Sequence, residues 1–295
     1  MSYIGFIGIG RMGSHMVLNL LEKYRVIVYD INHARYKEVV EKGAIETNAL
    51  KDIYSNASII FLALNSGAEV ESICTGKEGI FKNAKPGTIV IDCSSIDILT
   101  SRKLFDIAKI FGIEMLDAPM SGGVVGAATR NLTFMVGGSK EIYEKIKDVL
   151  LSMGKCSLYV GTAGNGQAAK ICNNLLLAIT MLGVSESLSL AEKLGLSPDI
   201  FYKISSNSSS KCWSMENYCP VSGIVKTSPS NYNFEPGFTT KQLIKDLKNT
   251  ILAFQKAELK PLIAELILDL YQISSSKGNE NLDFSSIIKL YRLED

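Results

Sequence analysis

The chain has 295 residues, 46% of them hydrophobic, and a formal net charge of +1. A chain of this length and composition can bury a large core and forms one large domain or two ordinary ones. Its lysines and arginines are scattered, so the basic patch typical of nucleic-acid-binding proteins is missing and we expect no nucleic-acid partner. The six cysteines include no Cys-x-x-Cys pair and only two histidines are present, which disfavours a zinc site and favours reduced thiols.

The first predicted strand, residues 3–7, leads directly into Gly8-Ile9-Gly10-Arg11-Met12-Gly13, and an amphipathic helix follows over residues 12–21. A second predicted strand, residues 25–29, ends at Asp30, about twenty residues after the glycines. In a dinucleotide-binding turn the first glycine permits the tight turn, the second lets the backbone approach the pyrophosphate, and the third lets the helix pack on the strand. The helix N-terminus then meets the negative charge. This segment therefore predicts a dinucleotide-binding site.

Asp30 favours NAD as the dinucleotide, because its carboxylate can accept hydrogen bonds from the ribose hydroxyls and repels a 2′-phosphate. Arg35 can reach a 2′-phosphate from the next helix, so NADP stays open as an alternative. The apolar run at the start of the chain contains the glycine motif itself and does not resemble a signal peptide. Together with the reduced thiols, this predicts a cytoplasmic location.

Short β-rich runs alternate with helical segments up to about residue 160. This alternation predicts a parallel, doubly wound α/β sheet of the Rossmann type. The further predicted strands are residues 58–64, 88–92, 114–117, 132–136 and 156–160.

After Gly164 the pattern becomes helical, with polar, turn-rich loops at residues 205–210 and 228–233. The change predicts two domains: a dinucleotide-binding domain of residues 1–163 and an all-α domain of residues 164–295, joined by a long helix. A cleft between two such domains is the expected active site. The predicted helices are residues 166–194, 198–205, 240–257, 261–277 and 284–290.

The longest uncharged apolar stretch of the chain, residues 175–184, lies within the long helix. It has about ten residues, whereas a membrane span needs about twenty. We therefore expect a buried helix and no membrane association.

Ser121-Gly122-Gly123 follows the predicted strand 114–117, at the edge where such sheets bind ligands. A hydroxyl and unobstructed backbone N–H groups suit a carboxylate or a phosphate. An ordinary glycine turn has the same spacing and is the alternative.

Lys170 is the single charge in the first part of the long helix, and Asn173 and Asn174 follow three and four positions later, on the same face. Burial lowers the pKa of a lysine, which would let Lys170 take a proton from a hydroxyl. The alternative is a surface lysine with a buried stem. Lys245, in the predicted helix 240–257, is a second candidate cation or part of a solvated face.

Four motifs occur in order along the chain. The glycine fingerprint is followed by Asp117-Ala118-Pro119-Met120-Ser121-Gly122-Gly123, by Gly164-Asn165-Gly166-Gln167-Ala168-Ala169-Lys170-Ile171-Cys172-Asn173-Asn174 and by Lys245-Asp246-Leu247. Together they resemble the β-hydroxyacid dehydrogenase family, of the 6-phosphogluconate dehydrogenase-like superfamily, over nearly the whole chain. Three shorter segments resemble its 3-hydroxyisobutyrate dehydrogenase branch: Ser209-Ser210-Lys211-Cys212-Trp213-Ser214, Tyr218-Cys219-Pro220-Val221-Ser222-Gly223 and Asp283-Phe284-Ser285.

The resemblance implies the site residues. Lys170 is the implied catalytic acid/base, and Asn174 orients the reacting substrate. The implied substrate-binding residues are Ser121, Gly122, Gly123, Asn173 and Lys211. The implied cofactor-binding residues are Gly8, Gly10, Arg11, Met12, Gly13, Asp30, Leu64, Asn65, Ser95 and Lys245. No metal is implied.

The chain departs from the family pattern at several positions. Glu69 stands where a cofactor-contacting asparagine is usual, and Arg130 stands in place of a glycine. Ser210-Lys211 replaces Gly-Arg, so the charge is kept but the planar fork of arginine is lost. Ser95 stands where threonine is commoner and keeps the hydroxyl. Leu177 occupies the position where decarboxylating relatives have a glutamate, which favours oxidation without decarboxylation.

The function implied is reversible NAD-dependent oxidation of 3-hydroxyisobutyrate to methylmalonate semialdehyde, a step of valine breakdown. Another member of the family, such as a tartronate or succinate semialdehyde reductase, is one alternative. A non-catalytic nucleotide-binding interaction module is the alternative from another class. Family members associate through the helical half, so a homodimer or homotetramer is expected.

Overall fold

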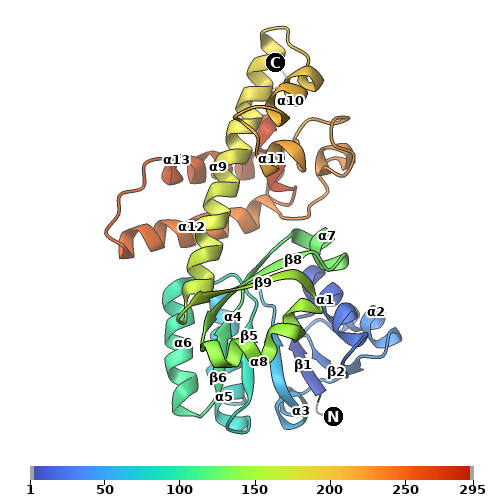
Figure 1. Ribbon diagram of the computed structural model, residues 1–295, viewed down its shortest axis with the longest axis vertical. Coiled ribbons are helices and arrows are strands. Elements are labelled where there is room, and N and C mark those ends of the chain that lie inside the picture. The colour runs from blue at the N-terminus through green and yellow to red at the C-terminus, as the bar shows by residue number, and fades with distance from the viewer. Residues whose placement is uncertain (1–2, 293–295) are drawn as a thin grey trace. The chain divides into compact units, whose positions relative to one another are not determined.

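The computed structural model describes residues 3–292 of the chain. The chain divides into two compact units, residues 1–170 and 171–295 (Figure 1). The described strands all belong to the first unit, and the long helix α9 (Asn165–Lys193) crosses the division. Secondary structure therefore changes where the sequence predicts it. The domain boundary at residues 163 and 164 stays a prediction, because the first turn of α9 belongs to the first unit.

One mixed sheet forms the centre of the first unit. Its strand order is β3-β2-β1-β4-β5-β6-β8-β7, with β9 paired to β8. The strands are β1 (Tyr3–Ile7), β2 (Val26–Tyr29), β3 (Ile45–Glu46), β4 (Ala57–Leu62), β5 (Ile89–Asp92), β6 (Glu114–Asp117), β7 (Met120–Ser121), β8 (Leu132–Gly138) and β9 (Gly154–Gly161).

The sheet is parallel from β3 to β6, but β8 runs antiparallel to both β6 and β7. The predicted doubly wound α/β fold is therefore confirmed, with the correction that the sheet is mixed at this edge. The connection from β6 to β8 contains the unpredicted strand β7 and the short helix α7 (Gly123–Ala128). That helix packs against α1, where the Asn19 amide donates to the Ala127 carbonyl at 2.7 Å. The connection from β6 to β8 is therefore not a crossover between parallel strands, and β8 runs beside β6 in the opposite direction.

Helices cover both faces of this sheet, as the doubly wound prediction requires. Successive residues of a strand point to opposite faces, so Phe6 packs with one helix layer and Ile7 with the other. The first layer contains α1 (Arg11–Leu21), α2 (Tyr36–Glu41), α7 and α8 (Lys140–Leu151). The second contains α3 (Leu50–Asn56), α4 (Gly67–Thr75), α5 (Ile80–Asn83) and α6 (Ile98–Ile110).

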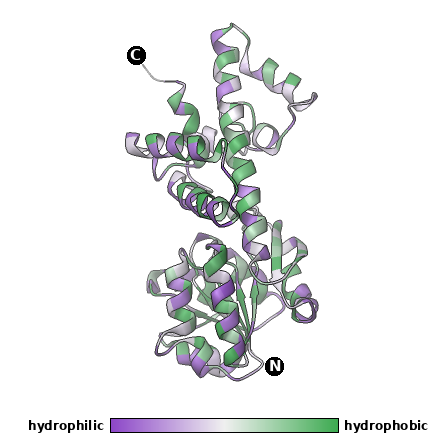
Figure 2. Ribbon diagram, turned by 90° about the vertical axis from the view of Figure 1, so that its left-hand side faces the viewer, coloured by the Kyte–Doolittle hydropathy of each residue, from purple (hydrophilic) through white to green (hydrophobic). Residues whose placement is uncertain are grey.

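The second unit packs its helices around the later turns of α9, and apolar and polar residues alternate along the helices (Figure 2). Ala178 and Met181 of α9 are fully buried with Leu243 and Tyr271. Leu243 lies on a helix whose N-terminus is stabilised by a capping box, formed by Thr239 before the helix and Gln242 in its first turn. The elements are α10 (Pro198–Ser206), α11 (Trp213–Glu216), α12 (Thr240–Lys256), α13 (Ala264–Ser274), a π-helix at Ser275–Asn279, and 3₁₀ helices at Pro229–Tyr232 and Phe284–Leu290.

One helix among the described residues, α9, is long and apolar enough by length and composition to cross a membrane. The expectation from the sequence considered only the uncharged stretch 175–184, whereas the whole helix reaches that length because few charges interrupt it on either side of this stretch. The same measure is met by the core helices of globular domains. Since Ala178, Met181 and Leu188 are fully buried among side chains of the second unit, we read α9 as a core helix.

Candidate functional site

The glycine fingerprint has the geometry that a dinucleotide turn requires. Gly8 has φ of +94°, and a Cβ there would lie 2.4 Å from the carbonyl oxygen of Ala63. A Cβ on Gly13 would lie 2.1 Å from the Gly8 carbonyl oxygen, so only glycine lets α1 approach β1 this closely. The Cβ direction of Gly10, by contrast, is open, with its nearest neighbour, Arg35 Nη1, at 3.8 Å. The second glycine therefore leaves room for a ligand at the backbone.

The N-terminus of α1 follows this turn without a side-chain cap or an acidic residue in its first turn. Arg11 and Met12 are its first two residues. The first N–H groups of a helix have no partners within the helix and favour negative charge. A pyrophosphate fits this arrangement of open glycine and helix N-terminus.

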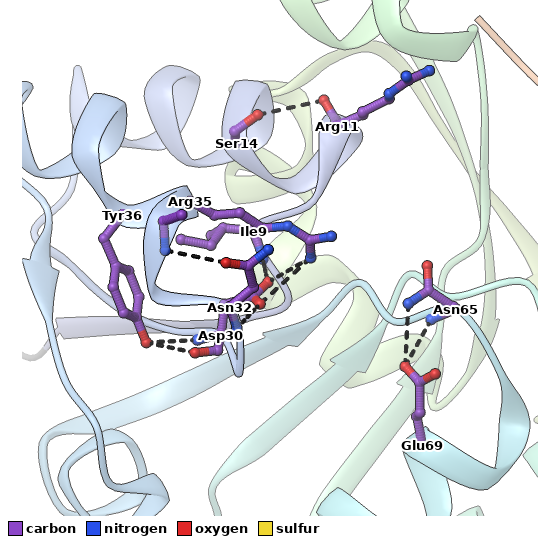
Figure 3. Close-up of polar contacts among 10 residues, drawn as sticks. Ile9, Arg11, Ser14, Asp30, Asn32, Arg35, Tyr36, Asn65 and Glu69 are labelled. Carbon is purple, nitrogen blue, oxygen red and sulfur yellow. Dashed lines mark hydrogen bonds and ion pairs between the residues drawn. The ribbon is translucent and has the colours of Figure 1, made fainter. Parts of the chain in front are cut away.

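Asp30 lies just after β2 and is buried (Figure 3). Its Oδ2 accepts from the Ile9 N–H at 2.9 Å, and its Oδ1 accepts from the Asn32 N–H at 2.8 Å. The Arg35 guanidinium contacts the same carboxylate, at 3.1 Å to Oδ2. The Tyr36 hydroxyl holds the Asp30 backbone, 2.8 Å from its nitrogen and 2.9 Å from its carbonyl oxygen. The carboxylate is thus fixed beside the glycine turn.

The other predicted cofactor residues of the first unit lie after the next two strands of the sheet. The Leu64 N–H donates to Ser94 Oγ at 2.9 Å, which ties the loop after β4 to the loop that carries Ser95. Asn65 donates to Glu69 Oε2 from its backbone N–H at 3.2 Å and from its amide at 3.4 Å (Figure 3). Glu69 therefore reaches a predicted cofactor residue, and its negative charge distinguishes this chain from the usual asparagine.

Ser121 ends the two-residue strand β7, and the backbone turns at the two glycines that follow. Gly122 and Gly123 have φ of +137° and +63°. A Cβ on Gly122 would lie 3.1 Å from Leu132, whereas a Cβ on Gly123 would meet nothing within 4 Å. The segment is a tight turn with an open backbone on one side. Whether it binds a carboxylate stays a prediction.

Arg130, at the usual glycine position, adopts the left-handed conformation with φ of +57°. This explains why glycine is common there, since other residues adopt that region at a cost. The guanidinium donates to Asn19 Oδ1 at 3.1 Å and forms an ion pair with Glu22. The departure is thus accommodated within the first unit by contacts to α1.

The first turn of α9, which leads directly to Lys170 in the next turn, is fixed to the sheet by two buried side chains. Asp117, at the end of β6, accepts from the Gly164 N–H at 2.8 Å and from the Gln167 N–H at 2.9 Å. The Gln167 amide donates to the Ser94 carbonyl at 2.8 Å and accepts from the Ile96 N–H at 3.1 Å. Gly166 permits this approach, because a Cβ there would lie 2.4 Å from the Met135 carbonyl oxygen.

Asp117 and Gln167 are absent from the predicted site residues, although both belong to the quoted motifs. A carboxylate at a helix N-terminus satisfies N–H groups and interacts favourably with the helix dipole. Burial raises the pKa of Asp117, and the N–H groups of Gly164 and Gln167 oppose that rise. Their positions in the motifs could have identified them, because Asp117 ends a strand and Gln167 lies in the first turn of a helix.

In the second unit, Asn173 and Asn174 lead into a polar chain that ends on α12. The Asn173 amide donates to Asn174 Oδ1 at 3.1 Å, and the Asn174 amide donates to Asp246 Oδ2 at 2.6 Å. Lys245 Nζ lies 3.4 Å from Asp246 Oδ1. Buried Asp246 therefore connects two predicted site residues, Asn174 and Lys245, and is a further residue that the sequence reasoning missed.

The three segments of the narrower resemblance come together in the second unit. Trp213 stacks on Tyr218 with ring centroids 4.8 Å apart, and Tyr218 stacks on Phe284 at 5.5 Å. The Tyr218 hydroxyl donates to Asp283 Oδ2 at 2.9 Å. Burial and the Asp283 charge raise the pKa of Tyr218, so it stays protonated. Lys211, expected to bind substrate, forms an exposed ion pair with Glu216 at 3.0 Å.

Among residues 3–292, no group of three or more His, Cys, Asp or Glu side chains is placed to hold a metal ion. The six cysteines are free thiols.

Two protein-family models match the chain. One describes the NAD binding domain of 6-phosphogluconate dehydrogenase and matches residues 3–161. The other is described as NAD-binding of NADP-dependent 3-hydroxyisobutyrate dehydrogenase and matches residues 164–291. Both halves of the chain therefore match models from one superfamily, in the order expected.

Individual relatives cover nearly the full chain. The mitochondrial 3-hydroxyisobutyrate dehydrogenase of Bos taurus is 38% identical over 99% of this chain and 87% of its own length. The NAD-dependent L-serine dehydrogenase of Pseudomonas aeruginosa is 35% identical over 99% of this chain and 98% of its own. The solved structure of Mycobacterium tuberculosis 3-hydroxyisobutyrate dehydrogenase with L-serine has a TM-score of 0.92 and 33% identity, covering 99% of this chain and 100% of that one. The chain therefore belongs to the β-hydroxyacid dehydrogenase family and is an NAD-dependent dehydrogenase.

Proposed function

We propose that this dehydrogenase oxidises 3-hydroxyisobutyrate to methylmalonate semialdehyde, as a step of valine breakdown, with Lys170 as the general acid/base. The observation that carries the proposal is the anchoring of the first turn of α9 by Asp117 and Gln167. A general base must be held in place to be effective, since small displacements of a reacting group cost rate. The names of the Bos taurus and Mycobacterium tuberculosis relatives support the substrate.

In this proposal Lys170 takes the proton of the substrate hydroxyl, and bound NAD supplies the hydride acceptor. Ser121 and the backbone N–H groups of Gly122 and Gly123 hold the substrate carboxylate. Asn174, whose amide is fixed by Asp246 and Asn173, orients the substrate through the second N–H of its amide or the second lone pair of Oδ1. Proton removal by a positioned base contributes on the order of 10² to 10⁴ in rate, and orientation supplies the rest.

L-serine is the strongest alternative substrate, because it is also a 3-hydroxy acid and it appears with two of the relatives. Serine differs from 3-hydroxyisobutyrate at the second carbon, where an ammonium replaces a methyl group. Leu177, half-buried on α9 in an apolar cluster, favours oxidation without decarboxylation for either substrate. A semialdehyde reductase of the same family is less well supported, because the Cys212-Trp213 and Pro220-Val221 segments resemble the 3-hydroxyisobutyrate branch.

The test of the substrate is NADH formation at 340 nm with 3-hydroxyisobutyrate, L-serine, 3-hydroxypropionate and the alcohol forms of tartronate and succinate semialdehydes. We expect the highest kcat/KM with 3-hydroxyisobutyrate. A higher kcat/KM with L-serine would make L-serine the substrate and leave the proposed role of Lys170 unchanged.

The test of Lys170 is the Lys170→Ala variant, with Lys193→Ala as a matched control because it removes an exposed lysine from the last turn of the same helix. We expect Lys170→Ala to lower kcat by about 10² to 10⁴, with NADH binding retained, and Lys193→Ala to match the wild type. Equal activity of the two variants would remove Lys170 from the role. Absence of turnover in the wild type, with NADH bound, would support the non-catalytic interaction module instead.

The homodimeric or homotetrameric state and the cytoplasmic location stay predictions.

A further inference from the structure

The carboxylate of Asp30 has every acceptor position in use. A carboxylate offers about four lone-pair positions on its two oxygens. The Ile9 N–H takes one on Oδ2, and the Asn32 N–H takes one on Oδ1. Arg35 Nη1 contacts both oxygens, at 3.1 Å to Oδ2 and 3.4 Å to Oδ1. In this arrangement Asp30 cannot also accept hydrogen bonds from the two hydroxyls of a ribose.

Of these three donors, Arg35 is the one that can move away. The Ile9 and Asn32 donors are backbone N–H groups, so releasing them would require the glycine turn or the loop after β2 to change shape. The Arg35 side chain is 44% exposed, whereas that of Asp30 is 3% exposed. The guanidinium can turn into solvent at the cost of one partly exposed ion pair, which changes an equilibrium constant by no more than about five-fold.

The Arg35 side chain also borders an open hollow next to the fingerprint. The hollow has a volume of about 580 Å³ and is lined by Gly10, Arg11, Ser14 and Arg35, among others. Arg35 Nη1 lies in the open Cβ direction of Gly10, at 3.8 Å. Figure 3 shows the Arg35 guanidinium against the Asp30 carboxylate. The same side chain thus contacts the acidic residue that favours NAD and borders the space beside the glycine turn.

We propose that Arg35 sets the preference of this dehydrogenase between NAD and NADP. It competes with the ribose hydroxyls for Asp30, which weakens NAD binding. It also screens the Asp30 charge and presents a planar guanidinium, the group best suited to a phosphate, which permits NADP binding. The chain thus accepts a 2′-phosphate despite an aspartate at the position that usually excludes it. The inference concerns cofactor binding and does not depend on which hydroxy acid is the substrate.

The test is equilibrium binding of NADH and NADPH, followed by their fluorescence, to the wild type, to Arg35→Ala and to Arg35→Met. The methionine variant keeps an unbranched stem over the fold and removes the charge. Lys42→Ala is the matched control, because it removes an exposed cation just after the last turn of α2, the helix that Arg35 immediately precedes. Melting temperatures confirm that each variant is folded.

We expect both Arg35 variants to bind NADH about two- to five-fold more tightly, which is the factor that corresponds to the loss of a partly exposed ion pair. We expect NADPH to bind roughly tenfold more weakly, because the cation opposite its 2′-phosphate is gone and the Asp30 charge is exposed. Lys42→Ala should leave the ratio of the two dissociation constants unchanged. An unchanged ratio in the Arg35 variants, or equal weakening of both cofactors, would overturn the proposal. Failure of hydroxy-acid oxidation in the wild type would leave these binding results, and so the inference, standing.

Discussion

Asp117 in the first unit and Asp283 in the second are both buried and accept hydrogen bonds from several donors, but the two carboxylates hold different segments of the chain. Asp117 in the first unit binds the backbone N–H groups of Gly164 and Gln167, at the start of the helix that carries Lys170. Asp283 in the second unit accepts from Ser285 through both its N–H and its hydroxyl, and from Tyr218, Gly237 and Phe238. None of the partners of Asp283 is a predicted site residue.

The comparison distinguishes a carboxylate that positions a predicted catalytic residue from one that only stabilises the fold. Both side chains satisfy backbone N–H groups that would otherwise be buried without partners, which costs about 1 to 3 kcal/mol for each group. At Asp117 the ordered segment leads to a predicted catalytic lysine, whereas at Asp283 it joins two loops around the aromatic stack of Tyr218 and Phe284. The same chemistry therefore predicts a change in rate at one position and a change in stability alone at the other.

The largest effect on stability is expected for Asp283→Asn. Each carboxylate oxygen of Asp283 accepts from more than one donor. In either orientation of the asparagine side chain, its NH₂ group would therefore face at least two donors and could accept from none of them. We expect the free energy of unfolding to fall by about 2 to 4 kcal/mol, with kcat unchanged after correction for the folded fraction. Urea unfolding and steady-state kinetics measure the two quantities. A large loss of kcat in the folded variant would contradict the assignment of a purely stabilising role to Asp283.

A smaller loss of stability is expected for Asp117→Asn, because only one N–H group would face the new amide. We expect about 1 to 2 kcal/mol, together with a decrease in kcat of roughly tenfold as the first turn of α9 shifts. The same assays apply, with NADH binding as a control for the cofactor site. If Asp117→Asn and Asp283→Asn lowered stability alone, Asp117 would have no positioning role.

The smallest effect is expected in the pH dependence of stability. Burial raises the pKa of both Asp117 and Asp283 above the ordinary value of 3.8. Between that value and the raised pKa the folded state binds more protons than the unfolded state, so the free energy of unfolding falls as pH rises through this window. Each group contributes at most about 1.4 kcal/mol per pH unit. We therefore expect the difference between the wild type and each asparagine variant to shrink from pH 4 to pH 7 in urea titrations, and growth with pH would contradict the assignment.

The sequence predicts the first unit well where one local rule decides the structure. Glycine spacing identifies the dinucleotide turn, and Gly8 and Gly13 occupy sites where any Cβ would meet a backbone oxygen. Short continuous apolar runs identify the parallel strands, because each strand is covered on both faces. The direction of β8 follows from no such local rule: the segment before it, α7, packs against α1 through Asn19 and Ala127, which lie more than a hundred residues apart.

In the second unit the apolar periodicity predicts α9, α10 and α12 to within two residues at their ends, because amphipathic spacing is also a local property. The predicted helix 261–277 begins later, at Ala264, and its end continues from α13 (Ala264–Ser274) as a π-helix, Ser275–Asn279. The segment 284–290 forms a 3₁₀ helix. The aromatic stack of Trp213, Tyr218 and Phe284 joins segments that no spacing rule connects.

By itself, the sequence determined the family, the cofactor class and the candidate residues, because these depend on short motifs whose spacing has a fixed physical meaning. Only the tertiary structure decided what those residues are bonded to. Hydrogen bonds to partners distant in the chain identify three further residues that position the site residues: Asp117, Gln167 and Asp246. The sequence likewise contains both Asp30 and Arg35, but their competition for the same lone pairs follows from burial and from the direction of a side chain, which the order of residues does not record.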